Sequence, residues 1–561
     1  MWHEAPELVL KHIFCYLEAS DLHAVSLTCR LWHQVAKEDA VWKQLVQRLW
    51  KIKGLSLPSG RNSWRNEFRR LTYETPTSLS ETLHEHTDEV LDVSFSHNGK
   101  LFCTTSKDAT VKVWELGYPT KIKHNAKMLI LLGWNLTQFS IFNKSDSFLC
   151  VCGVQFGGTV GNYFPSSSGR AAVFRTSDFK IMQTMMMEPP QLFADWYDDT
   201  TVLGGYVEEN QTILHIKAFK VKEEGTGNIQ EPVSGQIVYS FDTDHHHTMN
   251  LLVADLPCEH QSHDQSCYHI FTAHQKMKGT QHVKNGKIKE TDSVMNKACS
   301  CEKQKMMIFV CGQHSGLSIH DVTNLHKKIS NRNTRQSANS RLPNNSAKSA
   351  INNKVRQASG ASGRSRQGQR NQSEANSTGG PGTSRELPGA SVVDKPTHSP
   401  SFDKYYISGM KLSQDHRELY FNHRVCHYDA FDDEGYPKID SEIVIDKYDL
   451  VNKTHTKDLL QGHKAFSKYP AWYICLDINQ DYIVSGSEDG RAYLWDRHYL
   501  CFLGHLPHSI NPDIVINGTT FCPTDSECVV TGADDGIIHV WRSPRRHAEL
   551  EKQQGLVAMD M

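Results

Sequence analysis

Histidine and cysteine residues are crowded in one stretch near the middle of this 561-residue chain. Zinc favours four nitrogen or sulfur ligands, often supplied as pairs at short, regular spacing. Here the spacing is C-x-H-x2-H-x3-C, which is not a standard zinc pattern, so we expect a polar insertion, no metal site and no cofactor. The residues concerned are Cys258, His260, His263, Cys267 and His269, followed by Cys299 and Cys301; the run His245–His247 is also expected in a loop.

A covalent catalyst needs a nucleophile with a base and an orienting group beside it. Cys311 and His314 are close in sequence, but a Cys–His pair means little without a third group and a pocket. The sequence contains neither the phosphate-binding pattern G-x-x-x-x-G-K-[ST] nor the nucleophile pattern G-x-S-x-G. We therefore expect no catalytic residues and a protein that is not an enzyme.

His and Asp recur beside Ser or Thr and Trp in three places, which favours a structural role over a catalytic one. In each place an Asp precedes a Trp by six residues, as in a tight turn followed by a strand that ends in Trp. A hydroxyl on the preceding strand can join His and Asp in a hydrogen-bonded set, because buried polar atoms need partners. The three predicted sets are His86, Ser106, Asp108 and Trp114; His463, Ser487, Asp489 and Trp495; and His505, Thr531, Asp535 and Trp541.

A repeat of about 40 residues with His at one end and Trp at the other is typical of WD40 propellers. Weaker strand patterns without the Trp lie at 137–174, 192–219, 306–322 and 405–450. We predict an all-β propeller of about seven blades, with room for eight, over residues 81–320 and 401–545, and a tail at 546–561.

The segment between the two propeller parts, 321–400, is poor in bulky apolar residues. From Val322 to Gln372 it has eleven Lys or Arg and no Asp or Glu. Such a composition predicts a flexible basic insertion rich in Ser, Asn and Gly. It could contact an acidic partner or RNA, but a solvated loop is the preferred interpretation. The formal net charge of −2 points neither to nucleic acid nor to a membrane.

The first fifty residues predict three short helices. Pro6 can begin the first, and Leu10, Ile13, Phe14 and Leu17 lie on one stripe. The second stripe is Leu22, Val25, Cys29, Trp32 and Val35–Ala36, and the third helix carries Trp42, Leu45 and Leu49. So small a unit buries little surface alone and needs a partner. Residues 51–80 predict a connector, with a helix at 62–74 and a strand leading into the propeller.

Residues 6–45 resemble an F-box, on the strength of Pro6, Leu17, Asp21-Leu22, Cys29-Arg30-x-Trp32 and Trp42. Ala5 and Thr28 replace the usual Leu and Val. The resemblance implies that these helices, 1–50, dock on the Skp1 adaptor of a cullin-1 ubiquitin ligase. The residues it assigns to Skp1 binding are Pro6, Val9, Ile13, Leu17, Leu22, Val25, Cys29 and Trp32.

An F-box followed by a connecting helix and WD40 repeats resembles the F-box/WD-repeat substrate receptors. Within that group, NSWRNEFRRL, KDATVKVW, SGSEDGRAYLWDRHY and DDGIIHVWRSPR are most similar to the F-box/WD repeat-containing protein 5 family. The resemblance implies a non-catalytic subunit of an SCF (Skp1–cullin-1–F-box) ligase whose propeller binds the protein to be ubiquitinated. The alternative is a WD40 scaffold with no ubiquitin role.

In several such receptors an Arg cluster on one propeller face grips a phosphorylated peptide. The residues before the three turn Asp positions, which should lie on that face, are Lys107, Glu488 and Asp534. Two of the three are acidic, so we expect an unmodified or mixed-charge client segment, with Arg170 and Arg491 nearby. The candidate substrate face is thus Lys107, Glu488, Arg491 and Asp534.

The family also suggests docking on the DDB1 adaptor of cullin-4 ligases through Trp-Asp-x-Arg at the end of a blade. Here Trp495-Asp496-Arg497-His498 has its Arg one place early, and Trp541-Arg542 has no Asp. Cullin-4 use is therefore the less favoured mode.

The fifteen Cys follow no regular framework, and no charged-then-apolar leader pattern opens the chain. The apolar run at 128–134 is far below the roughly 20 residues that span a bilayer. We expect reduced thiols in the cytosol, with the nucleus as a second location, and no membrane partner.

Overall fold

The computed structural model describes the chain from Pro6 to Met559 except for a set of internal segments. The segments outside the described residues are 53–55, 157–166, 188–193, 208–212, 223–228, 230, 243–248, 258–303, 312–315, 331–393, 401, 403, 433–436 and 467–472. The Cys/His stretch from Cys258, the run at 245–247, His314 and most of the basic insertion lie there, so the expectations for them stay predictions.

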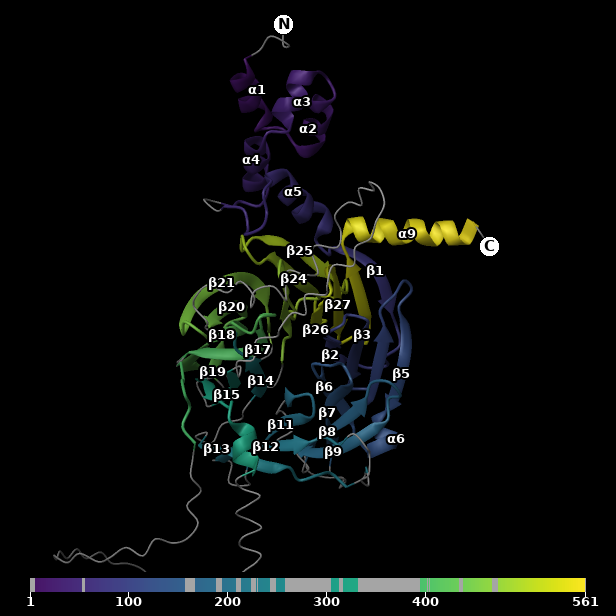
Figure 1. Ribbon diagram of the computed structural model, residues 1–561, viewed down its shortest axis with the longest axis vertical. Helices are drawn as coiled ribbons and strands as arrows, with labels where there is room; N and C mark the ends of the chain where they lie inside the picture. The colour runs from purple at the N-terminus through teal and green to yellow at the C-terminus, as the bar shows by residue number, and fades with distance from the viewer. Residues whose placement is uncertain are drawn as a thin grey trace, which may run out of the picture. The chain divides into compact units, whose positions relative to one another are not determined.

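Four helices open the chain: α1 (Glu7–Phe14), α2 (Ala19–Ser26), α3 (Arg30–Ala36) and α4 (Asp39–Leu49) (Figure 1). The prediction of one helix through Cys29 is wrong, because the chain leaves the helix after Ser26. The hydroxyls of Ser26 and Thr28 bond to the carbonyls of His23 and Val25, and Cys29 is extended with φ −155°. Such hydroxyl-to-carbonyl bonds compete with the helical ladder.

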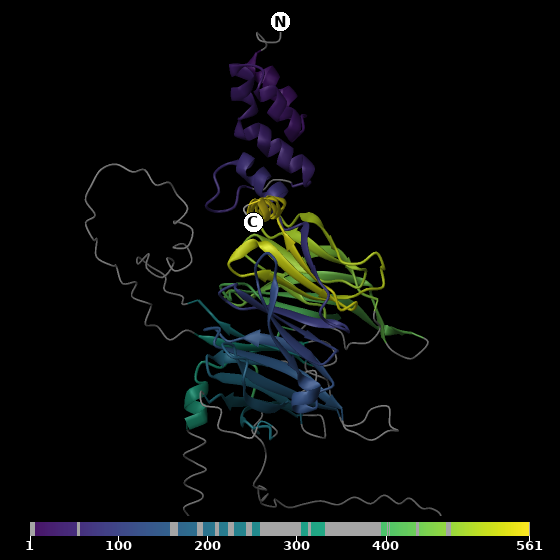
Figure 2. The ribbon, with the colours of Figure 1, turned by 90° about the vertical axis from the view of Figure 1, so that its right-hand side faces the viewer.

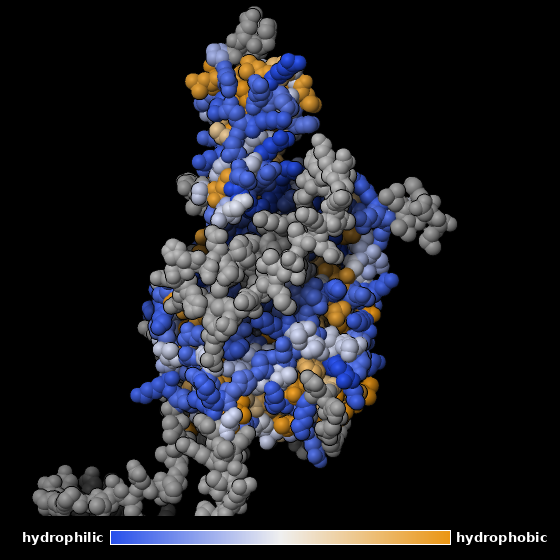
Figure 3. Space-filling view, in the orientation of Figure 1, coloured by the Kyte–Doolittle hydropathy of each residue, from blue (hydrophilic) through white to orange (hydrophobic). Residues whose placement is uncertain are grey.

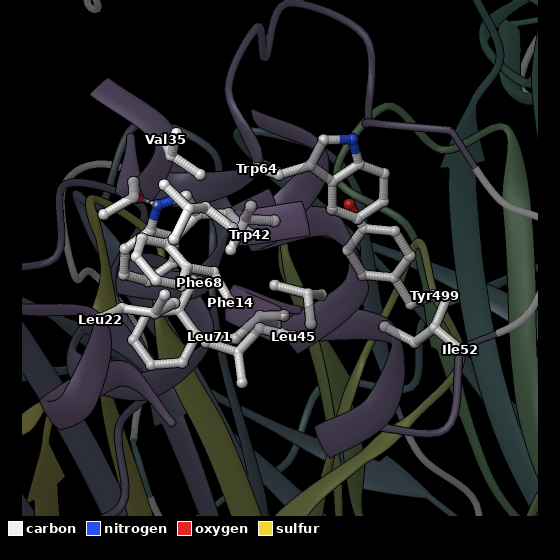
Figure 4. Packing of buried hydrophobic residues seen from close by; sticks show 14 residues of the cluster. Phe14, Leu22, Val35, Trp42, Leu45, Ile52, Trp64, Phe68, Leu71 and Tyr499 are labelled. Carbon is white, nitrogen blue, oxygen red and sulfur yellow. Dashed lines mark hydrogen bonds between the residues drawn. The ribbon is translucent and has the colours of Figure 1, made fainter. Parts of the chain in front are cut away.

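The connector is α5 (Trp64–Arg69) followed by the π-helical turn η2 (Arg70–Glu74). Ser63 begins α5 by accepting a bond from the amide of Asn66. Trp64, Phe68 and Leu71 are buried in one apolar cluster with Trp42 of α4 (Figure 4). Tyr499 of the propeller joins that cluster, stacked on Trp64 with ring centroids 6.1 Å apart. The connector therefore shares one core with the helices before it and the strands after it.

The described strands form seven sheets, which confirms a seven-bladed propeller (Figure 1). The first three blades are β2 (Val90–Phe95), β3 (Leu101–Ser106), β4 (Thr110–Glu115) and β5 (Lys121–Lys127); β6 (Leu136–Phe142), β7 (Phe148–Phe156), β8 (Ser167–Arg175) and β9 (Ile181–Met187); and β10 (Asp195–Asp198), β11 (Thr201–Val207), β12 (Ile213–Lys220) and β13 (Gln236–Asp242). A short helix, α6 (Met128–Leu132), links the first two blades.

The remaining blades follow the same antiparallel order. They are β14 (Met249–Asp255), β15 (Lys305–Cys311) and β16 (Gly316–Asp321); β17 (Tyr405–Leu412), β18 (Glu418–Phe431), β20 (Glu442–Asp449) and β21 (Thr454–Lys464), with β19 (Pro437–Ile439) beside β18; β22 (Leu476–Ile478), β23 (Tyr482–Ser485), β24 (Arg491–Asp496) and β25 (Phe502–Pro507); and β26 (Ile516–Cys522), β27 (Asp525–Ala533) and β28 (Ile538–Arg542).

The seventh blade is completed by β1 (Ser78–Leu83), which pairs antiparallel with β28. The strand after the connector and the last strand of the propeller therefore belong to one sheet, which removes two free edges. The helix α9 (Pro544–Met559) follows β28 and packs against η2 and β1 (Figure 2). The start and the end of the propeller are thus fixed beside the connector.

Antiparallel order gives each blade two distinct ends. The turns between its first and second strands and between its third and fourth strands lie at one end, which we call the connector end. In the sixth blade, Asp481, Asp496 and Tyr499 lie at these turns and contact the connector. The turns between second and third strands, and the links to the next blade, lie at the opposite end, which we call the far end.

Contacts separate a second unit, Leu325–Val392, from the rest of the chain. Only 325–330 of this unit is described, and it is helical. Among the described residues, the helices are all too short or too polar to span a bilayer. In the same part of the chain, His, Cys, Asp and Glu nowhere gather in threes that could hold a metal ion.

Candidate functional site

Apolar side chains gather at the end of the helical domain, residues 6–49, that lies away from the propeller (Figure 3). Leu8, Tyr16 and Leu27 are 78%, 69% and 72% exposed, and Val9 is also exposed. Side chains of this size are seldom left together in water without a partner. This surface of α1 and α2 is therefore a candidate interface.

The eight residues predicted to bind an adaptor fall into three groups. Pro6, Val9, Ile13 and Cys29 are exposed. Leu17, Val25 and Trp32 are half-buried against the helical core, and Trp32 packs edge-on to Phe14 with centroids 5.6 Å apart. Leu22 is only 1% exposed, so its assignment to the interface is corrected: it supports the core beneath.

Leu8, Tyr16 and Leu27 were missed by the sequence prediction. The apolar stripe predicted for the first helix corresponds mainly to the buried face of α1, which contains Leu10 and Phe14. An apolar residue outside that stripe, such as Leu8, indicates a second apolar face. That pattern was present in the sequence and could have identified the exposed surface.

A buried ion-pair network joins the connector to the sixth blade. Arg70 donates through Nη2 to Oε1 of Glu67 and to Oδ2 of Asp496, each at 2.5 Å. Burial disfavours its charge, but the carboxylates of Asp496 and Glu67 outweigh burial and raise the pKa of the Arg70 guanidinium. Arg61 adds a bond to Asp481 at 2.7 Å. This network fixes how the helices are held on the propeller.

The first predicted polar set is present with one change. His86 bonds to Asp108 at 2.9 Å and to the hydroxyl of Thr104 at 2.8 Å, and Trp114 Nε1 donates to Thr104 at 2.9 Å. Thr104 thus takes the position expected for Ser106. Ser106 accepts a bond from the amide of Asp108 and closes the turn instead. Desolvation lowers the pKa of His86, so the ring is neutral and serves as a structural link.

The second set is incomplete. Ser487 donates to Asp489 at 2.6 Å, and Tyr493 donates to the other carboxylate oxygen at 2.6 Å. His463 is fully buried beside Trp495, and neither ring nitrogen has a hydrogen-bond partner among the described residues. Burial lowers the pKa of His463 to about 3, so its ring is neutral.

In the third set, Trp541 Nε1 donates to Thr531 at 2.9 Å as expected. The prediction for His505 is wrong: β25 continues to Pro507, so His505 remains in the sixth blade, edge-on to Tyr493. His508 instead lies 3.7 Å from Asp535. The histidine that lies near Asp535 is therefore His508 and not the predicted His505.

At the far end the structure brings Lys107 and Asp534 together from the first and seventh blades. Lys107 pairs with Glu89 at 2.7 Å, and Asp534 accepts a bond from Asn517 at 2.6 Å. Burial raises the pKa of Asp534 to about 6, and the charge of Glu89 adds to that effect. These two candidates lie on one mainly acidic surface, on which Lys107 is exposed and Asp534 is half-buried.

The other far-end candidates are placed differently. Glu488 is 7% exposed and accepts a bond from the amide of Phe466, so its assignment to the substrate face is corrected. Arg491 is exposed, with Asp489 at 4.0 Å. Arg170 is half-buried and lies 3.4 Å from Gln155.

Three aspartates on the first strands of blades were not selected from the sequence. Asp92, Asp195 and Asp477 accept the backbone amides of Ser140, Val253 and Phe521, at 2.9, 2.6 and 2.8 Å. Each acceptor therefore holds the first strand of the next blade. An Asp inside an otherwise apolar strand, as in V-L-D-V and C-L-D-I, was the signal that could have revealed them.

Residues 5–48 match the family described as F-box-like, and 77–115 and 454–496 match the WD domain, G-beta repeat. The chain is 27% identical to F-box/WD repeat-containing protein 5 of Mus musculus and of Homo sapiens, in each case over 96% of this chain and 94% of the relative. A WD repeat-containing protein 26 homolog of Arabidopsis thaliana is 43% identical over 26% of this chain and 22% of its own length.

Proposed function

Because the chain is an F-box/WD-repeat protein, we propose that it is the substrate-recognition subunit of an SCF ubiquitin ligase. Its α1–α2 surface binds Skp1, through which cullin-1 is recruited, and its propeller binds the client. The observation that carries the proposal is the exposure of Leu8, Tyr16 and Leu27 on a domain whose opposite side is packed on the propeller.

The ligase subunit itself does no chemistry in this scheme. It holds a lysine of the client within reach of a ubiquitin-loaded enzyme, so that a bimolecular reaction becomes nearly unimolecular. Such positioning needs a stiff connection, which the buried Arg70–Asp496 pair supplies. The client contacts the far end, where Lys107 and Arg491 are exposed and Asp534 is half-buried.

The cytosol, with the nucleus as a second location, is the proposed compartment. The ten cysteines whose side chains the structure describes all have free thiols, in agreement with a reducing environment. The DDB1–cullin-4 mode gains no support from the sixth blade. There Arg497 is held by Glu418 at 2.8 Å and Asp496 is bound to Arg70.

The test is binding of purified Skp1 to the full chain by calorimetry. Val9→Glu with Ile13→Glu places charges on the exposed apolar surface and should weaken binding by at least about tenfold, which is 1.4 kcal/mol. Leu49→Glu is the matched control, since Leu49 is an exposed apolar residue at the end of α4. If the unmodified chain does not bind Skp1, the proposal fails and the alternative, a WD40 scaffold with no ubiquitin role, is the one that stands.

A further inference from the structure

Three consecutive large apolar side chains are exposed on α6. Leu129, Ile130 and Leu131 are 57%, 77% and 40% exposed. Runs of exposed apolar residues are rare on soluble domains unless they serve an interaction. The α1–α2 surface described above does not include these three residues.

This exposure is built into the fold. Met128 and Trp134, on either side of the exposed residues, are buried in the core shared by the first two blades. The amide of Met128 donates to Ala109 at 2.8 Å, and Gly133 ends the helix with φ 70°. Because both sides of the turn are anchored, the three apolar side chains are held outward.

Phe156, at the end of β7, extends the same surface and is 48% exposed. Its amide donates to the side chain of Asn135 at 2.7 Å, which holds the end of β7 next to the segment that follows α6. We call Leu129, Ile130, Leu131 and Phe156 the α6 surface. Apolar side chains are visible at this side of the propeller in Figure 3.

The surroundings of the α6 surface are cationic. Between Glu115 and Asp146 the chain has four Lys and no Asp or Glu. Lys123 and Lys127 are exposed on β5, the outer strand of the first blade, and in the described part of the chain neither forms an ion pair. A partner with carboxylates beside its apolar side chains is therefore the complementary one.

The position of α6 also fits client binding. It links β5 to β6 and so lies at the far end, with the turns that carry Lys107 and Asp534, while the connector occupies the opposite end. A client bound there would not compete with the connector or with α9.

We propose that the α6 surface docks a short client segment that carries large apolar side chains flanked by Asp or Glu. That the bound protein is a ubiquitination client rests on the proposed function; the chemistry of the contact does not. It is a docking site separate from the acidic surface around Asp534, so the propeller holds its client at two points.

The test uses the full chain and two fluorescein-labelled peptides, in which Leu and Ile alternate either with Glu and Asp or with Lys. Fluorescence anisotropy should show saturable binding of the acidic peptide and at least about tenfold weaker binding of the basic one. L129D with I130D should weaken the acidic peptide about tenfold or more, and Lys127→Glu should weaken it less. Ile510→Asp is the matched control, because Ile510 is fully exposed on another link at the far end.

Equal binding of both peptides, or loss of binding in Ile510→Asp, would overturn the proposal. Self-association of the chain that is lost in I130D, measured by sedimentation, would assign the surface to a second copy. Binding to phosphatidylserine vesicles that is lost in I130D would assign it to a membrane. Skp1 binding is measured in parallel, so a failure of the proposed function is seen separately from a failure at the α6 surface.

Discussion

Arg70 of the connector and Asp496 of the sixth blade form a buried ion pair, with Nη2 and Oδ2 2.5 Å apart. Asp496 also accepts the amides of His498 and Tyr499, so one carboxylate closes its own turn and binds the connector. Asp496 is the Asp of a Trp-Asp dipeptide. The dipeptide that ends a repeat therefore also serves as the attachment point of the helical domain.

Removing the guanidinium should destabilise this attachment strongly. Arg70→Met leaves Asp496 buried without its cation and Glu67 with only the more distant Arg61 at 3.6 Å, a change that costs about 3–5 kcal/mol. The free energy of unfolding, from denaturant titration, should fall by that amount, and amide exchange in α5 should accelerate. Arg61→Met is the control: Arg61 is partly exposed, pairs with Asp481 at 2.7 Å and lies 3.6 Å from Glu67, and such partly exposed pairs contribute about 1 kcal/mol or less. Equal losses in both variants would contradict a special role for Arg70.

The polar set of the first blade predicts different costs for two neighbouring hydroxyls. Thr104→Val leaves His86 Nε2 and Trp114 Nε1 buried without a partner, and unpaired buried groups cost about 1–3 kcal/mol each. Ser106→Ala removes the bond from the amide of Asp108 and the bond to the carbonyl of Asp88, and should cost about 1–2 kcal/mol. Thermal unfolding of the two variants makes the comparison, and a larger loss in Ser106→Ala would restore the original assignment of Ser106.

The propeller architecture could be predicted from the sequence because each of the three clear repeats contains the residues that determine its own turn and strand. Asp before a strand that ends in Trp specifies a turn and a buried ring, as Asp108 and Trp114 show. The weak blades were predicted only from strand patterns that lack the Trp. Side-chain partners were less predictable, because strand register decides between Thr104 and Ser106, and the end of β25 decides between His505 and His508. Burial of Leu22 and Glu488 depends on packing between segments, which no local pattern contains.

Burial raises the pKa of Asp195 to about 7 and that of Asp92 to about 6. Each side chain binds its proton more tightly in the folded chain than in the unfolded chain, where the pKa is about 3.9. Their contribution to stability is therefore full below about pH 4 and is lost as the pH rises through about 6 to 7.

Asp195→Asn resembles the protonated side chain and keeps an oxygen that can accept the amide of Val253. We define the difference as the free energy of unfolding of Asp195→Asn minus that of the unmodified protein. This difference should be larger at pH 8 than at pH 5 by roughly 1–3 kcal/mol, because only the unmodified protein loses the bound proton. Denaturant titrations at the two pH values measure this difference. Asp178→Asn, at an exposed carboxylate with a lowered pKa, should show no such change. A pH-independent difference for Asp195→Asn would show that Asp195 is ionised throughout this range.

Substitutions of two similar-sized residues of the helical domain should separate its folding from the proposed adaptor binding. Leu22 is 1% exposed and Ile13 is 37% exposed, although both fit the expected F-box pattern. Leu22→Ala should destabilise the domain by about 2–5 kcal/mol, since it leaves a cavity in the core. Ile13→Ala should change stability by about 0.5 kcal/mol or less. In Skp1 titrations made well below the melting temperature of either variant, Ile13→Ala should bind more weakly than Leu22→Ala. The reverse order would mean that adaptor binding depends on the integrity of the helical core rather than on the surface of α1.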